Sequence, residues 1–210
     1  MSPSDELIVP DHAPSYLAHR QTIGWLAISL PVILAAGNAL IFGGNPILHS
    51  ISRYYYTGMR DAFVGGLCAM AMFLIFYSGF DAWEDWTGNI AGVCALGVAF
   101  FPTTDGGPIT VVGILHHVCA ACLYLALSAY ALLLFPRSLH IDSQATRNWD
   151  RAHRVCGLIM LCCVIAMALH NSIHWCDPSK CIFAFLVETI ALEAFGISWL
   201  IEGRLLRSLA

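Results

Sequence analysis

Six segments of the chain consist almost entirely of apolar residues, and this pattern restricts what the chain can fold into. They cover residues 23–42, 61–80, 87–101, 110–135, 155–174 and 181–201. A helix needs roughly 20 apolar residues to cross a bilayer, and fewer where polar residues face the interior of a bundle. The chain is 58% hydrophobic and 11% charged, whereas an ordinary soluble domain is roughly 25% charged. The sequence therefore predicts an all-α membrane protein, a bundle of six transmembrane helices.

No long linker separates the six segments, so we predict one transmembrane domain over residues 23–203 with short tails at 1–22 and 204–210. Basic residues lie mainly in the tails and in the loop between the fourth and fifth segments. Because basic loops stay in the cytoplasm, both termini are predicted to be cytoplasmic, with the chain in the inner (cell) membrane. The polar, acidic N-terminal segment does not have the pattern of a cleavable signal peptide.

The charge and the small residues add expectations about partners and packing. A net charge of −4 argues against nucleic acid as a partner, and membrane lipids are the expected one. A second copy of the chain, or a membrane complex in which this chain is an accessory subunit, remains an alternative. Small residues let helices approach closely, and they recur every four residues in the second and third segments. We predict packing faces at Gly65 and Ala69 and at Ala91, Ala95 and Ala99.

Ionisable side chains gather at the predicted outer ends of the helices. His116 and His117 lie about two turns into the fourth segment, and Glu188 lies about two turns into the sixth. His170 and His174 end the fifth segment. Seven residues of helix are roughly 10 Å long, so these groups should reach similar depths. Ionisable groups inside a membrane are costly unless paired or hydrated, so we expect them to line a polar, outward-facing cavity.

Several interpretations of this cluster stay open. In the first, His170 and His174 bind zinc with His117 as the third ligand, or with His116 or Glu188 in its place, because an i, i+4 histidine pair can hold one ion and leave an open position. Zinc-bound water would hydrolyse a lipid amide or ester, with Asp61 and Glu188 in catalytic roles. In the second, histidines of the fourth and fifth helices bind haem. In the third, the histidines and acids are structural: they hydrogen-bond to each other, lock the helices and hold an outer cavity open. We favour this structural role, with the cavity binding a lipid headgroup or a small polar ligand; transport is a further alternative.

Residues around the start of the second segment extend the candidate site. Arg53 and Arg60 are predicted to bind phosphate or carboxylate groups at the level of the lipid headgroups. Tyr55 belongs to a run of three tyrosines that would form an aromatic wall, and His116 is a further candidate ligand-binding residue. The alternative is that Arg60 and Asp61 form a charged interfacial cap, since a helix N-terminus favours a negative charge.

Two cysteines flank a short polar stretch between the fifth and sixth segments. Cys176 and Cys181 enclose Asp177-Pro178-Ser179-Lys180, whose turn residues can bring the two thiols together. An outer loop permits a disulfide bond, which we predict between these two cysteines. The alternatives are a pair of metal ligands beside His174 or two free thiols.

Three runs resemble a group of bacterial six-span membrane proteins. They are SISRYYYTGMRDAFVG at residues 50–65, AFFPT at 99–103 and FGISW at 195–199, with a histidine of the 116–117 pair as a further match. This group is similar to domains of unknown function of the FRAG/DRAM type. The resemblance implies a six-helix bundle, and its matching positions Arg60 and Asp61 fall in the predicted outer cluster.

A second, weaker resemblance is to membrane hydrolases of the alkaline ceramidase and adiponectin-receptor type. Those proteins have seven helices and hold zinc with three histidines, and the spacing of His170 and His174 matches their last-helix pair. The chain departs from that pattern in two ways. It has no Ser-x-x-x-His on its second helix, and its histidine pair lies on the penultimate helix. This resemblance implies the zinc hydrolase alternative.

Overall fold

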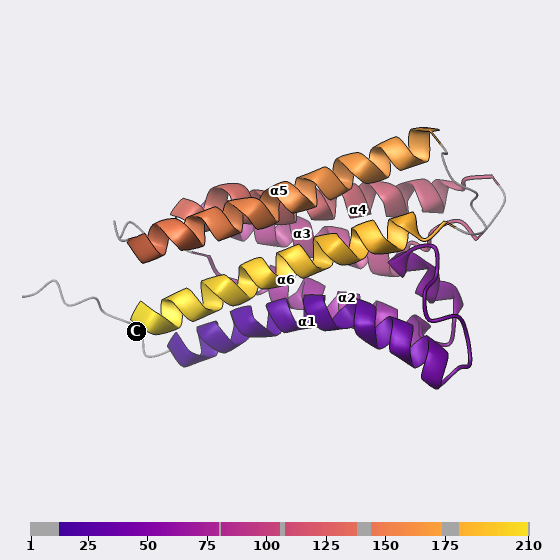
Figure 1. Cartoon of the computed structure of the whole chain (residues 1–210), viewed down its shortest axis with the longest axis horizontal. Coiled ribbons are helices and arrows are strands. Elements are labelled where there is room, and N and C mark those ends of the chain that lie inside the picture. The colour runs from indigo at the N-terminus through magenta and orange to yellow at the C-terminus, as the bar shows by residue number, and fades with distance from the viewer. Residues whose placement is uncertain (1–12, 80, 106–107, 138–143, 174–180, 210) are drawn as a thin grey trace, which may run out of the picture.

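The computed structural model describes residues 13–79, 81–105, 108–137, 144–173 and 181–209. It contains a helix over each of the six predicted segments (Figure 1). These helices are α1 (Ala13–Leu40), α2 (Arg60–Ile75), α3 (Ala82–Phe100), α4 (Val111–Ala129), α5 (Gln144–Ile173) and α6 (Phe183–Leu209). Three short helices complete the described chain: the 3-10 helix η1 (Ile51–Tyr56), the π-helix η2 (Tyr130–Leu134) and the 3-10 helix η3 (Phe135–Arg137).

The six long helices form a ring in chain order, because each packs against the next and α6 packs against α1. α1 and α6 lie side by side, and α1 begins at the end of the bundle where α6 finishes (Figure 1). We call this the terminal end, and the end that carries η1 the opposite end. Apolar side chains such as Leu30, Phe63, Leu127 and Leu192 fill the interior of the ring.

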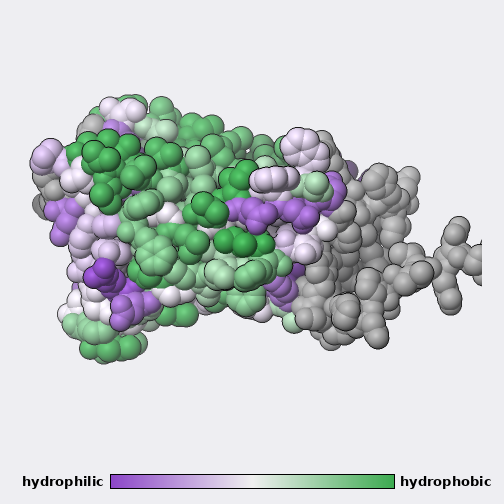
Figure 2. All heavy atoms as spheres, turned by 180° about the vertical axis from the view of Figure 1, so that it is seen from behind, coloured by the Kyte–Doolittle hydropathy of each residue, from purple (hydrophilic) through white to green (hydrophobic). Residues whose placement is uncertain are grey.

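The outer surface is compatible with a membrane. Four helical stretches within the described residues are long and apolar enough to cross a bilayer: Ala18–Leu40, Val111–Leu134, Arg147–Ile173 and Phe183–Gly203. The six predicted segments are thus all helical, and four of them meet this criterion. On the coloured part of the face in Figure 2, hydrophobic side chains cover much of the surface, and hydrophilic ones gather at one end and beside the part drawn in grey.

Two helix starts lie well before their predicted positions. α1 begins at Ala13 rather than at residue 23, and α5 begins at Gln144 rather than at residue 155. The predicted starts leave Arg20 in the N-terminal tail and His153 in the loop between the fourth and fifth segments. The structure corrects this assignment, because both side chains are buried inside the bundle. Each has a partner on another helix, since Glu202 of α6 lies beside both, so neither residue ends its helix.

The two packing faces predicted from small residues, on α2 and on α3, differ in how closely they pack in the structure. Ala91, Ala95 and Ala99 are at most 1% exposed, which confirms the packing face predicted on α3. Gly65 does not pack, because no atom of a neighbouring segment would lie within 4 Å of a Cβ added there. Helix backbones approach closely at other glycines, both between α2 and α3 and between α1 and α6. A Cβ on Gly196 would lie 2.7 Å from the backbone oxygen of Gly24, and a Cβ on Gly24 would lie 2.9 Å from that of Gly196.

This contrast predicts opposite effects of the same substitution. Gly196→Ala should separate α1 from α6 and destabilise the protein by about 1–3 kcal/mol, the usual range for overpacking. Gly65→Ala should be neutral or stabilising by up to about 1 kcal/mol. Alanine favours the helical conformation more than glycine does, and its methyl group would contact no atom of a neighbouring segment. Thermal unfolding of the purified variants in detergent checks this. Equal melting temperatures for the two variants would contradict the packing described for Gly196.

Candidate functional site

A cavity of about 770 Å³ lies at the opposite end of the bundle, between α4, α5 and α6. η1 and the segment 103–104 also contribute to its wall. We call it the histidine cavity after its most prominent polar residues. These polar residues include His49, Arg53, His116, His117, His170 and Glu188. The structure thus brings five of the residues predicted as ligand-binding, metal-binding or catalytic to one cavity, together with His49.

The two adjacent histidines of α4 are fixed by backbone carbonyl groups. Thr110 caps the helix, since its hydroxyl oxygen accepts a hydrogen bond from the Gly113 amide at 3.0 Å. His116 is buried, and its Nδ1–H donates to the oxygen of Phe101 at 2.6 Å. His117 is exposed at the cavity wall, and its Nδ1–H donates to the oxygen of Gly113 at 2.6 Å. Because a carbonyl oxygen only accepts, both rings carry a proton on Nδ1.

Glu188 and His49 join the loop after α1 to the start of α6. The carboxylate of Glu188 accepts a hydrogen bond from the Ile51 amide at 2.6 Å, at the first residue of η1. The Nδ1–H of His49 donates to the oxygen of Cys181 at 3.0 Å, and the Phe185 amide donates to the oxygen of His49 at 2.9 Å. Glu188 was predicted as a catalytic residue. In the structure its carboxylate positions η1 against the cavity.

The rim of the cavity carries a charged pair. The guanidinium of Arg53 lies 2.7 Å from the Asp105 carboxylate and donates to the oxygen of Thr104 at 3.3 Å. It also lies 5.5 Å from the centre of the Tyr56 ring. Partial burial and the negative charge of Asp105 raise the pKa of Tyr56, so its hydroxyl stays protonated and donates to the oxygen of Thr103. These contacts hold the segment 103–105 against η1.

Three other predicted site residues lie away from this wall. Arg60 and Asp61 are exposed at the start of α2, and neither lines the histidine cavity. The guanidinium of Arg60 donates to the Tyr55 hydroxyl at 2.5 Å and lies 4.3 Å from the centre of that ring. Tyr55 does not line the cavity either. Arg60 and Tyr55 form a separate surface pair, and a role for these three residues in ligand binding or catalysis stays a prediction.

The predicted zinc and disulfide sites are only partly within the described residues. His170 packs against the Phe183 ring with 4.9 Å between ring centres, and His174 lies outside the described residues. Within the described part of the chain, no three His, Cys, Asp or Glu side chains are placed to hold one metal ion. Cys181 is disulfide-bonded, whereas the seven other cysteines with described positions are free. Cys176 is outside the described residues, so its pairing with Cys181 stays a prediction.

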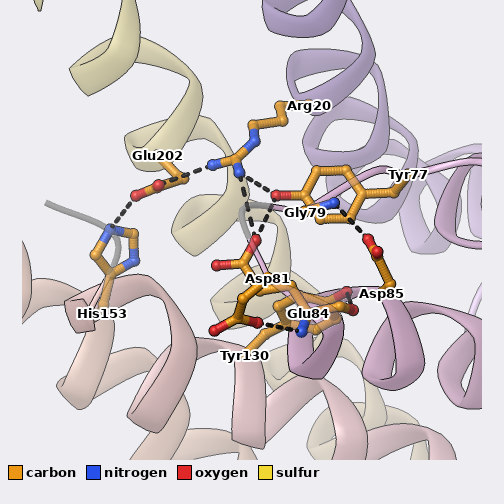
Figure 3. Close-up of polar contacts among 9 residues, drawn as sticks. All are labelled: Arg20, Tyr77, Gly79, Asp81, Glu84, Asp85, Tyr130, His153 and Glu202. Carbon is orange, nitrogen blue, oxygen red and sulfur yellow. Dashed lines mark hydrogen bonds and ion pairs between the residues drawn. The ribbon is translucent and has the colours of Figure 1, made fainter.

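A second polar centre lies at the terminal end, where no site was predicted (Figure 3). Arg20, Glu84, His153 and Glu202 are each at most 3% exposed, and we call them the buried ion network. One guanidinium nitrogen of Arg20 lies 2.8 Å from Glu202, and the other lies 3.9 Å from Glu84. Nε2 of His153 lies 3.3 Å from the second carboxylate oxygen of Glu202. The network thereby connects α1, α3, α5 and α6.

Hydroxyl groups complete the network. Tyr77 accepts a hydrogen bond from Arg20 and donates to the Glu84 carboxylate at 3.0 Å. The Tyr130 hydroxyl donates to the backbone oxygen of Glu84 at 2.5 Å. Nδ1 of His153 lies 2.9 Å from the hydroxyl oxygen of Ser198. Buried charges need such partners, because an uncompensated ion in the interior is strongly unfavourable.

Aromatic rings surround these charges. The Trp199 ring lies 5.1 Å from the Tyr77 ring and 5.5 Å from the Phe135 ring, measured between centres. The guanidinium of Arg20 lies 5.0 Å from the centre of Tyr77 and 5.6 Å from that of Phe135. This shell excludes water, which strengthens the electrostatic interactions inside it. A sequence signal did exist: Arg20, Glu84, His153 and Glu202 all lie near the predicted inner ends of the spans.

Removing the cation of this network should be costly. Arg20→Met leaves the Glu202 carboxylate without its closest partner, and we expect a loss of about 3–5 kcal/mol in unfolding free energy. The double variant Arg20→Met/Glu202→Met should recover part of this loss, because the buried anion is removed as well. Arg60→Met is the control, and as an exposed substitution it should change stability by less than about 0.5 kcal/mol. The measurement is the free energy of unfolding in mixed micelles. Equal values for Arg20→Met and Arg60→Met would contradict the stabilising role of the network.

Comparison with known proteins finds no matching family model, no matching curated protein and no matching solved structure. The two resemblances drawn from the sequence therefore stay hypotheses. The functional assignment has to come from the cavity and the buried network themselves.

Proposed function

We propose that the chain is an integral membrane protein that binds a lipid headgroup or a small polar ligand in the histidine cavity. The observation that carries this proposal is the cavity of about 770 Å³ with a mixed wall. Ligand sites in proteins typically have volumes of about 300–1,000 Å³, largely apolar walls and a few polar groups that orient the ligand. His117, Arg53 and Glu188 are such polar groups here, and Val187 and Ala191 belong to the apolar part.

The membrane part of the proposal is that all six helices cross the bilayer, with both termini in the cytoplasm. Four helical stretches have the required length and apolar composition. α2 has 16 residues and α3 has 19, which correspond to about 24 Å and 28 Å of helix. Both are close to the hydrocarbon thickness of about 30 Å. Because they complete the ring between α1 and α4, they must share the environment of their neighbours.

Filling the cavity should prevent binding. Ala184 lines the cavity from α6, whereas Leu186 is 45% exposed on the same helix and does not line it. Ala184→Phe should lose the bound molecule because the ring occupies ligand space, and Leu186→Phe should retain it. Native mass spectrometry of detergent-purified protein measures the bound molecule. The proposal fails if Ala184→Phe binds as well as wild type, or if wild type binds neither phospholipids nor their soluble headgroups.

The topology can be tested separately. Asn45 is exposed in the loop after α1, and Ser78 is exposed between α2 and α3. A membrane-impermeant maleimide should label Asn45→Cys in intact cells, because six crossings place this loop outside. It should label Ser78→Cys only after the cells are permeabilised. Wild type reports the background from native cysteines. Labelling of both variants in intact cells would exclude the proposed arrangement.

A further inference from the structure

The histidine cavity is exposed along the seam between α4 and α5. On α4, His117 and Ala121 line the cavity and are exposed. On α5, Ala168 and Asn171 line it and are exposed. Residues three or four positions apart lie along one edge of a helix, so each pair marks a continuous edge. The wall formed by α6 differs, because Val187 and Ala191 are buried there.

The same seam is closed nearer the terminal end. A Cβ added to Gly157 of α5 would lie 2.5 Å from Cγ of Leu132, so the two segments touch there. Ala121 precedes Leu132 by eleven residues, and Ala168 follows Gly157 by eleven. Eleven residues are close to three helical turns, or about 16 Å, which returns to nearly the same face. The faces that touch at Gly157 therefore stand opposite each other at Ala121 and Ala168, where they enclose an opening.

The position of this opening determines what can reach it. Ala121 and Ala168 lie within the apolar stretches Val111–Leu134 and Arg147–Ile173. If these stretches cross a membrane, as proposed above, the opening faces the acyl chains of the bilayer and not water. Small side chains on both edges leave space for a chain to pass. A molecule that enters here must itself be dissolved in the bilayer.

The polar wall favours a ligand that donates hydrogen bonds. His49 and His117 each use Nδ1–H to donate to a backbone oxygen. In the neutral ring this leaves Nε2 with a lone pair, which accepts a hydrogen bond. Glu188 adds a carboxylate to the same wall. Hydroxyl and ammonium groups are the headgroup chemistry that matches these acceptors.

We infer that the histidine cavity takes up a membrane lipid sideways, through the α4–α5 opening, and holds its hydroxyl or ammonium headgroup against His49 and His117. This inference rests on the proposed function and names the ligand class and its route. Phosphatidylethanolamine, whose ammonium group donates hydrogen bonds, is a suitable probe. Phosphatidylcholine is the matched control, because its quaternary ammonium has no N–H.

The experiment uses protein in nanodiscs that contain both lipids in equal amounts, with retained lipid identified by native mass spectrometry. Wild type should retain phosphatidylethanolamine over phosphatidylcholine by about threefold to tenfold, the effect of one hydrogen bond. His49→Phe/His117→Phe should lose this preference. Ala121→Trp/Ala168→Trp should lose the retained lipid because the opening is blocked.

The control for the blocked opening is Val118→Trp/Leu169→Trp, since Val118 and Leu169 are exposed on the same helices and do not line the cavity. This variant should retain lipid like wild type. Water-soluble phosphoethanolamine should still bind to the blocked variant, which shows that its cavity is folded.

Lipid retention by the blocked variant at the wild-type level would overturn the route. If wild type binds phosphoethanolamine and retains no lipid, the inference is wrong and the proposed function stands; if it binds neither, both fail.

Discussion

The ion pair between Arg20 and Glu202 is the contact on which the rest of the bundle depends. It joins the first helix to the last and thereby closes the ring, at a depth where neither side chain is exposed to water. Glu84 and His153 extend the pair to α3 and α5, so four of the six helices meet at one charged centre. A buried arrangement of this kind tolerates few alternative packings, which favours a single register between the helices.

Histidine and glutamate side chains have different surroundings at the two ends of the molecule. At the terminal end, histidine and glutamate side chains face each other and are sealed by the rings of Tyr77 and Trp199. At the opposite end, the polar groups of His117 and Glu188 are anchored to backbone atoms and face a cavity. Leucine and phenylalanine side chains separate the two centres. The buried ion network joins helices at the terminal end, and the polar groups at the opposite end line a cavity.

Apolar segment length was enough to predict where the six helices lie, because burial of backbone polar groups in an apolar environment demands helices. The depth argument also brought His117 and Glu188 to one end, since helix rise converts sequence position into depth. The depth argument could not predict that the Glu188 carboxylate would accept a hydrogen bond from the first residue of η1. The predicted first span begins at residue 23, so Arg20 falls in the N-terminal tail. Its burial depends on Glu202 at the other end of the chain, and no local pattern contains that pairing.

The Arg20–Glu202 pair also has a consequence for biosynthesis. During synthesis Arg20 is made with α1 and Glu202 only with α6, so this guanidinium meets the Glu202 carboxylate after the helices between them have been made. Glu84 lies 3.9 Å from a guanidinium nitrogen of Arg20 and precedes α6 in the chain. If the helices cross a membrane, as proposed, a chain that stops before Glu202 keeps the Arg20 cation in the bundle without this carboxylate, which is unfavourable there. The pair thus gives cellular quality control a physical difference between chains that contain α6 and chains that stop before it.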